Sequence, residues 1–186
     1  MLTVFIRDLP FLLLEPKKFF ESFKEKKVVD LLSYVFLLFT LSTILYICGN
    51  IISSAMTDTP IVSFNFLFVA VGMFGASVGL FLGIFAFHYK AIKWHGNNTE
   101  VQLSVPIGIY SMTPFVVLLF LMNFSWWFLL LGAVYSVYFY HLGLKRMGTH
   151  GMLNWITAVW GVFRGVVAMS VFALGAVMVL SSLLKI

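Results

Sequence analysis

Long apolar stretches dominate this 186-residue chain and follow a mixed N-terminal segment. A helix needs about 20 apolar residues to cross the ~30 Å hydrocarbon core of a bilayer. Hydrophobic residues make up 61% of the chain and charged residues 10%, whereas soluble domains contain about 45–50% and ~25%. We therefore expect an all-α, polytopic membrane helix bundle with five transmembrane helices. The predicted spans are Val28–Ala55, Ile61–His88, Val105–Phe124, Ser125–Leu142 and Leu153–Leu184.

The positions of Lys and Arg predict how the bundle is oriented. Cytoplasmic loops of membrane proteins carry an excess of these residues. Cations occur before the first span and in the second and fourth connections, whereas the opposite side holds only Lys185. The cations on the richer side are Arg7, Lys17, Lys18, Lys24, Lys26, Lys27, Lys90, Lys93, Lys145 and Arg146. This pattern predicts a cytoplasmic N-terminus and an outside C-terminus, and it accounts for the net charge of +5 without nucleic-acid binding.

Residues 1–27 differ in character from the five-span region 28–186. A helix is expected to begin at Pro16, because proline is favoured at the first helical position. Phe19, Phe20 and Phe23 would share one face of it. Such an amphipathic helix is expected to lie in the headgroup region, with phenylalanines in the lipid and lysines toward anionic headgroups. It would serve either as an anchor or as a curvature or partner-binding element.

Ionisable residues within the predicted spans are rare. Asp30 lies at the start of the first span and Arg164 lies within the fifth stretch. Both residues are expected at a similar depth in the membrane, where they are predicted to form an interfacial charge pair. Alternatively, the Arg164 side chain reaches lipid phosphate. Because no acidic residue is predicted near the midplane, the sequence disfavours a proton- or sodium-coupled transporter.

The histidines are weak metal-ligand candidates. His88 and His141 would end their spans at similar depth, and imidazole is the commonest metal ligand. Their spacing matches no zinc motif, and the chain has neither a nucleophile motif nor a phosphate-binding glycine loop. We therefore expect no enzyme activity and no cofactor, with His88 and His141 as weak metal candidates.

Small residues recur every four positions in two spans. Gly75, Gly79 and Gly83 form such a stripe in the second span, and Gly161 and Gly165 contribute to one in the fifth. Small residues at this spacing allow two helix backbones to approach closely. The stripes predict either packing within the bundle or an oligomer face.

The third span carries a polar cluster around a proline. Tyr110, Ser111, Thr113 and Pro114 lie near its middle. Pro114 is expected to kink the helix, and the hydroxyls would help to satisfy the backbone groups that it frees. Tyr135 and Tyr138 of the fourth span are expected to face this kink.

Several of these segments together resemble one membrane-protein family. They are Leu14-Glu15-Pro16-Lys17-Lys18-Phe19-Phe20, Phe87-His88-Tyr89-Lys90, Tyr110-Ser111-Met112-Thr113-Pro114 and Gly143-Leu144-Lys145-Arg146. The chain resembles the Yip family, named for interaction with Ypt/Rab GTPases, in its prokaryotic branch. The resemblance implies five spans, a cytoplasmic N-terminus and residence in a prokaryotic plasma membrane. It carries over no settled activity, and the chain lacks the Asp-Leu-Tyr-Gly-Pro motif of eukaryotic members.

These observations predict a non-enzymatic Yip-type membrane protein, acting as a self-associating organiser or trafficking-like scaffold. Its expected partners are membrane lipids and, through a homo-oligomer or otherwise, other membrane proteins. The alternative is a small permease or channel subunit that works through the Pro114 kink. A histidine-metal enzyme is the least favoured possibility.

Overall fold

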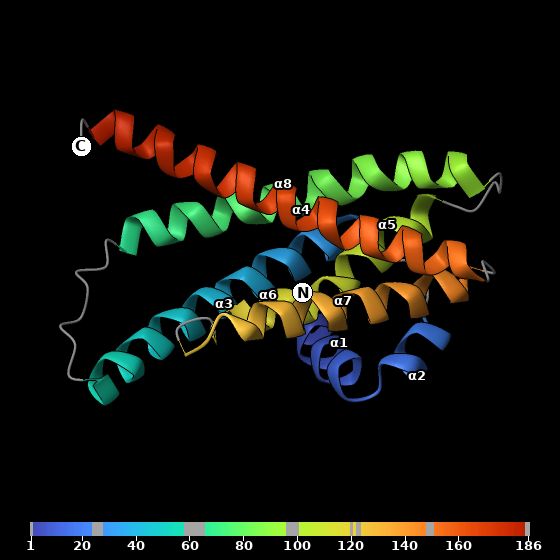
Figure 1. Ribbon diagram of the computed structural model, residues 1–186, viewed down its shortest axis with the longest axis horizontal. Coiled ribbons are helices and arrows are strands. Elements are labelled where there is room, and N and C mark those ends of the chain that lie inside the picture. Colours follow the sequence, from blue (N-terminus) through green and yellow to red (C-terminus); the bar gives the residue numbers. More distant parts are fainter. Residues whose placement is uncertain are drawn as a thin grey trace.

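The computed structural model describes residues 2–23, 28–57, 66–95, 101–119, 121, 124–147 and 151–184, which are helical apart from turns (Figure 1). This confirms the all-α prediction for the described chain. The predicted cations Lys24, Lys26, Lys27 and Lys185, and the side chains of His88, Lys90 and Lys93, lie outside the described residues. The helices are α1 (Leu2–Leu14), α2 (Pro16–Glu21), α3 (Val28–Thr57), α4 (Phe66–His95), α5 (Val101–Ser111), α6 (Thr113–Leu118), α7 (Trp127–Arg146) and α8 (Met152–Leu184).

Four helices of the described chain, α3, α4, α7 and α8, are long and apolar enough to cross a bilayer. The third predicted span is instead divided into α5 and α6 at Met112, and its apolar helical part, Ser104–Leu118, is shorter. Five continuous spans were expected, whereas the described residues form four long apolar helices and one broken helix. Pro114, near the start of α6, has no N–H for the next helical hydrogen bond, so the helix restarts there.

The long helices run in alternating directions and form two groups (Figure 1). Helix α8 packs most extensively against α4, while α7 packs against both halves of the broken helix. We call the end where α3 and α8 begin and α7 ends the arm end, because residues 2–23 (the N-terminal arm) pack there. The opposite end, where α3 and α8 end, is called the open end.

The N-terminal arm differs from the predicted interfacial helix. It contains two helices, and the second does begin at Pro16. Phe19, Phe20 and Phe23, however, are at most 4% exposed and belong to the core of the bundle. The expectation that these rings enter lipid was wrong, because neighbouring helices offer them an aromatic surface on which to pack.

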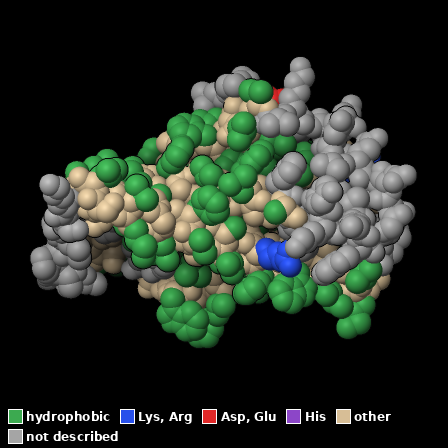
Figure 2. All heavy atoms as spheres, turned by 90° about the horizontal axis from the view of Figure 1, so that it is seen from above, with side chains coloured by type: hydrophobic (Ala, Val, Ile, Leu, Met, Phe, Trp, Pro, Cys, Tyr) green, Lys and Arg blue, Asp and Glu red, His purple; other side chains and the backbone are tan. Residues whose placement is uncertain are grey.

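The broken helix occupies the centre of the fold. All residues from 104 to 116 are buried, whereas most of α8 is exposed along its outer side. Figure 2 shows hydrophobic side chains spread over the described part of the face on which α8 lies. An exposed apolar surface around a packed centre is the distribution expected of a bundle surrounded by lipid.

Candidate functional site: the arm and the broken helix

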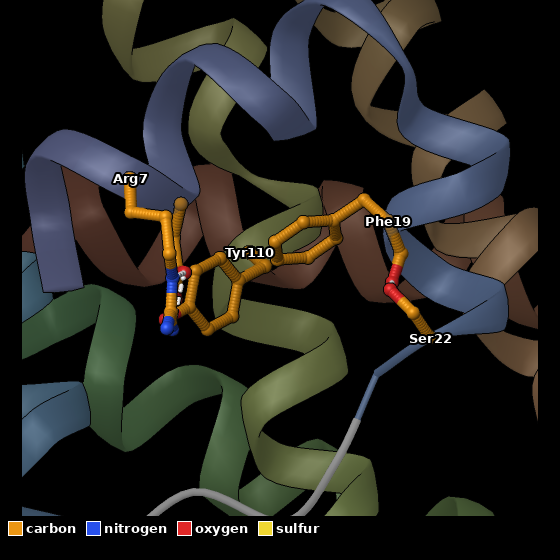
Figure 3. Close-up of polar contacts among 5 residues, drawn as sticks. Arg7, Phe19, Ser22 and Tyr110 are labelled. Atoms are coloured by element: carbon orange, nitrogen blue, oxygen red, sulfur yellow. Dashed lines mark hydrogen bonds and ion pairs between the residues drawn. The ribbon is translucent and has the colours of Figure 1, made fainter.

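A buried carboxylate joins the N-terminal arm to the broken helix. Asp8 of α1 is 3% exposed, and its Oδ2 accepts a hydrogen bond of 3.0 Å from the Tyr110 hydroxyl of α5. Its Oδ1 lies 2.9 Å from the guanidinium of Arg7, which is largely exposed (Figure 3). A charge-assisted hydrogen bond of this kind is stronger than a neutral one. The arm is therefore held to the bundle by a directional polar contact.

Aromatic rings surround this contact. The Phe19 and Phe23 rings lie 5.3 and 5.4 Å from the Tyr110 ring, and Figure 3 shows Phe19 beside Tyr110. The Tyr34 ring of α3 lies 4.2 Å from Tyr110. Phe20 reaches α7, where its ring lies close to Gly143. Rings at these distances and tilted angles attract one another beyond the area that they bury.

Hydroxyl groups satisfy the backbone where the helix breaks. Ser136 Oγ accepts a hydrogen bond of 3.2 Å from the Phe115 N–H, one of the free donors of the first turn of α6. Ser42 Oγ donates to the Val116 carbonyl at 2.8 Å, and Ser111 Oγ donates to the Ile107 carbonyl at 2.6 Å. The break is thus stabilised by neighbouring helices as well as by its own side chains.

Of the predicted third-span cluster, Thr113 makes a bond that the sequence did not indicate. Its Oγ1 lies 2.8 Å from the Tyr34 hydroxyl. Both residues are almost fully buried. Tyr110, Ser111, Thr113 and Pro114 therefore lie together in the core and connect α3, the arm and α5–α6.

Tyr135 and Tyr138 do not join that cluster. They are 54% and 42% exposed on the outer side of α7, and the side of α7 that faces the break carries Ser136. The prediction that these tyrosines face the kink was wrong. Successive residues of a helix point in different directions around its axis, and in α7 it is Ser136 that points toward the break.

The glycine stripe of α4 lies against α8 of the same chain. A Cβ atom on Gly79 would lie 2.5 Å from the Ala168 carbonyl oxygen, and one on Gly75 would lie 2.5 Å from that of Phe172. A Cβ on Gly83 would lie 2.6 Å from Ala168 Cβ. The structure places this stripe in packing within the bundle, so it is not available to a second copy.

The α8 glycines Gly161 and Gly165 are also buried. A Cβ atom on Gly165 would lie 3.3 Å from the Met112 sulfur, directly at the helix break. Gly165 therefore leaves room for the side chain at which the broken helix changes direction.

The predicted charge pair and metal candidates are more dispersed. Asp30 lies in the first turn of α3 and Arg164 within α8, and their pairing stays a prediction. The His141 ring stacks on Trp155 at 4.0 Å, with a buried Nδ1 that has no hydrogen-bond partner. Among the described residues, no group of three or more potential ligands could hold a metal ion.

Asp8 is the residue that sequence reasoning missed at this site. A lone carboxylate within an apolar helix costs free energy unless it is paired, so its place in the Leu2–Leu14 sequence was the available signal. Nothing local identified Tyr110 as its partner, because 101 residues separate the two along the chain. Ser42 and Ser136 gave no signal beyond their polarity.

Apolar helices long enough to cross a bilayer, packed around a buried broken helix, define a polytopic α-helical membrane protein. Within that class, the model of the Yip1 domain family matches residues 11–176. The chain therefore belongs to the Yip1 domain family, as the sequence resemblance predicted. Comparison with curated proteins and with solved structures gave no match.

Proposed function

We propose that this chain is a non-enzymatic membrane organiser that associates with itself through the exposed side of α7. Tyr135 and Tyr138 carry the proposal. Tyr135 lies about 12 Å along the helix axis from Trp127, and Tyr138 about 16.5 Å. Trp126 and Trp127 are exposed and stacked at the start of α7, as is typical of side chains at the membrane interface.

Both tyrosine hydroxyls then lie near the middle of a hydrocarbon core ~30 Å thick. Both side chains are substantially exposed, and within the described chain neither hydroxyl has a hydrogen-bond partner. A polar group without a partner in hydrocarbon costs about 1–3 kcal/mol by mutational data. The same side of α7 on a second copy presents identical donors and acceptors, which supports an interface between copies.

The test replaces both hydroxyls in the double variant Tyr135→Phe/Tyr138→Phe. Hydrogen bonds between membrane helices contribute roughly 0.6–2 kcal/mol each. The dissociation constant of the dimer should therefore rise by about 3- to 30-fold for each bond lost. Single-molecule photobleaching in liposomes at graded protein density measures this change. Ser182→Ala, on the exposed side of α8, is the control and should leave association unchanged. Equal association of the double variant and the wild type would contradict the proposal.

The proposed orientation places the N-terminal arm in the cytoplasm and the C-terminus outside. Support comes from Lys145 and Arg146, which end α7 at the same end of the bundle as Arg7, Lys17 and Lys18. Lys17→Cys and Lys145→Cys, each in a Cys48→Ser background, should both resist an impermeant thiol reagent in intact cells. Labelling of either variant in intact cells would contradict this topology.

The permease alternative has one observation in its favour, since broken helices line substrate sites in many transporters. Here Ser111, Thr113 and Ser136 already bond within the chain. The organiser is therefore the better-supported function. A flux assay in proteoliposomes separates the two, because solute flux that Pro114→Ala alters would favour the permease.

A further inference from the structure

We infer that the open end of the bundle holds one acyl chain of a membrane phospholipid in a groove between its helices. A hollow of about 440 Å³ separates the α4–α8 pair from α3, α6 and α7. This volume lies within the ~300–1,000 Å³ range of ligand pockets. We call this hollow the acyl groove, and its lining includes Tyr46, Phe68, Ala76, Phe115, Leu129 and Met169.

The chemistry of the acyl groove fits a hydrocarbon chain. Its lining is apolar except for the side-chain hydroxyls of Tyr46 and Ser170. Ser170 Oγ donates to the Val166 carbonyl of its own helix at 2.9 Å, so this hydroxyl is already engaged. A polar solute would lose its hydrogen bonds to water on entering such a groove, whereas a lipid chain would lose none.

The dimensions of the groove match one leaflet. Phe68 and Ala76, both of which line it on α4, are about 12 Å apart along the helix axis. Half of a ~30 Å hydrocarbon core is about 15 Å. The acyl groove therefore covers most of the depth that one acyl chain occupies.

The depth of the groove in the membrane also favours a phospholipid. Leu129 lines the groove and lies two residues after the exposed pair Trp126 and Trp127 at the start of α7. Tryptophan side chains of this kind lie at headgroup level. The groove thus begins just below the headgroups, and it ends at Phe115, Met169 and Ala76, each less than 9% exposed.

The exposed side chains around the groove indicate that its occupant comes from the hydrocarbon of the bilayer. Leu67, Leu174 and Met178 of the same two helices are 49%, 60% and 67% exposed. In a membrane these side chains contact lipid tails, so a chain enters sideways without crossing water. An empty groove would forfeit dispersion contacts along its lining, which makes occupancy by a lipid chain favourable.

The experiment uses the full-length protein in vesicles of phosphatidylcholine and phosphatidylglycerol. Part of the phosphatidylglycerol carries a diazirine at the middle of one acyl chain. After illumination, peptide mass spectrometry compares labelling at Met169, which is 5% exposed, with Met178, which is 67% exposed. We expect Met169 to be labelled at least as strongly as Met178, although bulk lipid reaches only Met178.

Filling the groove should remove that label. Ala173→Phe places a ring in the groove, and Ser170→Leu fills it by a smaller amount, whereas Val171→Phe adds a ring on the exposed side of the same helix. Ala173→Phe or Ser170→Leu should reduce Met169 labelling several-fold and leave Met178 unchanged. Val171→Phe should leave both unchanged. An unlabelled Met169 in the wild type, or labelling that neither filling variant reduces, would overturn the inference, as would crosslinks from a second copy inside the groove.

Discussion

The arm end of this bundle and the crossing of α4 with α8 are held together by different interactions. At the arm end, a buried Asp8–Tyr110 hydrogen bond and interlocking rings join the N-terminal arm, α3, α5 and α7. Near the middle of the bundle, where α4 and α8 cross (Figure 1), glycines of α4 pack directly against the α8 backbone and small side chains. Toward the open end, a groove lies between this pair and α3, α6 and α7. Directional bonds specify one arrangement, whereas close packing of small residues depends only on shape.

The two regions also differ in where their side chains find their contacts. Asp8, Tyr34 and Tyr110 at the arm end have hydrogen-bond partners within the chain, so the contact of the arm with the bundle is self-contained. At the open end, part of the lining surface has no protein neighbour and is left to lipid.

Removing a core ring should have the largest effect at the arm end. Phe20 is 1% exposed, and truncating such a buried phenylalanine costs about 3–5 kcal/mol. Phe20→Ala should release the arm, which limited proteolysis in detergent micelles would report as faster cleavage. Leu14→Ala is the control, because Leu14 is 81% exposed. Equal cleavage of both variants would show that the rings do not hold the arm.

Adding a side chain to the glycine stripe tests the contact between α4 and α8. In Gly79→Leu the new Cβ would meet the Ala168 carbonyl oxygen, and overpacking of this kind costs about 1–3 kcal/mol. The free energy of unfolding in SDS should fall by that amount. Gly175→Leu is the matched control, since a Cβ there meets no atom within 4 Å. Should Gly79→Leu leave stability unchanged, the α4–α8 contact would be looser than described.

Removing one hydroxyl tests the polar contact by itself. Tyr110→Phe deletes the donor to Asp8, and leaving a buried polar group without such a partner costs about 1–3 kcal/mol. Hydrogen–deuterium exchange in α1 should quicken accordingly. Tyr138→Phe removes a hydroxyl from the exposed side of α7 and should not alter exchange in α1. Identical exchange in the two variants would assign the arm's docking to the rings alone.

The smallest effect concerns pH. Glu15 accepts a hydrogen bond from Lys18 at 2.8 Å, and this bond raises the pKa of Lys18 above its ordinary value of 10.5. A lysine pKa that is raised in the folded state adds to the free energy of unfolding. This contribution is fully present below pH 10.5 and is lost as the pH rises through the pKa of the folded state. Because the pKa of Lys18 lies above 10.5, Lys18 stays protonated between pH 6 and pH 9. We therefore expect no change in arm cleavage over this range. A marked change within that range, retained in Glu15→Gln, would point to a different titrating group in the arm.

Much of the fold could be predicted because lipid imposes simple requirements. The long apolar helices follow from length and hydrophobicity, and Pro114 indicated a disruption of the third span. The glycine spacing indicated a close helix contact. The partner of each face could not be predicted, since Gly79 against α8, Tyr135 facing outward and Phe20 facing inward all depend on how helices rotate when they pack. Asp8 with Tyr110 depends on a contact between distant segments, which local pattern does not encode.

The sequence by itself determined that this chain is a helical membrane protein, because apolar length responds to the bilayer rather than to any neighbouring helix. Its particular motifs, not its composition, gave the resemblance to the Yip family. Only the tertiary structure decided which faces are covered. It turned the phenylalanines of the arm inward and the tyrosines of α7 outward, and it left a groove beside α8. The reason is that lipid and protein interior are similarly apolar, so hydrophobicity alone does not tell a helix which side to bury; shape and a few buried hydrogen bonds do.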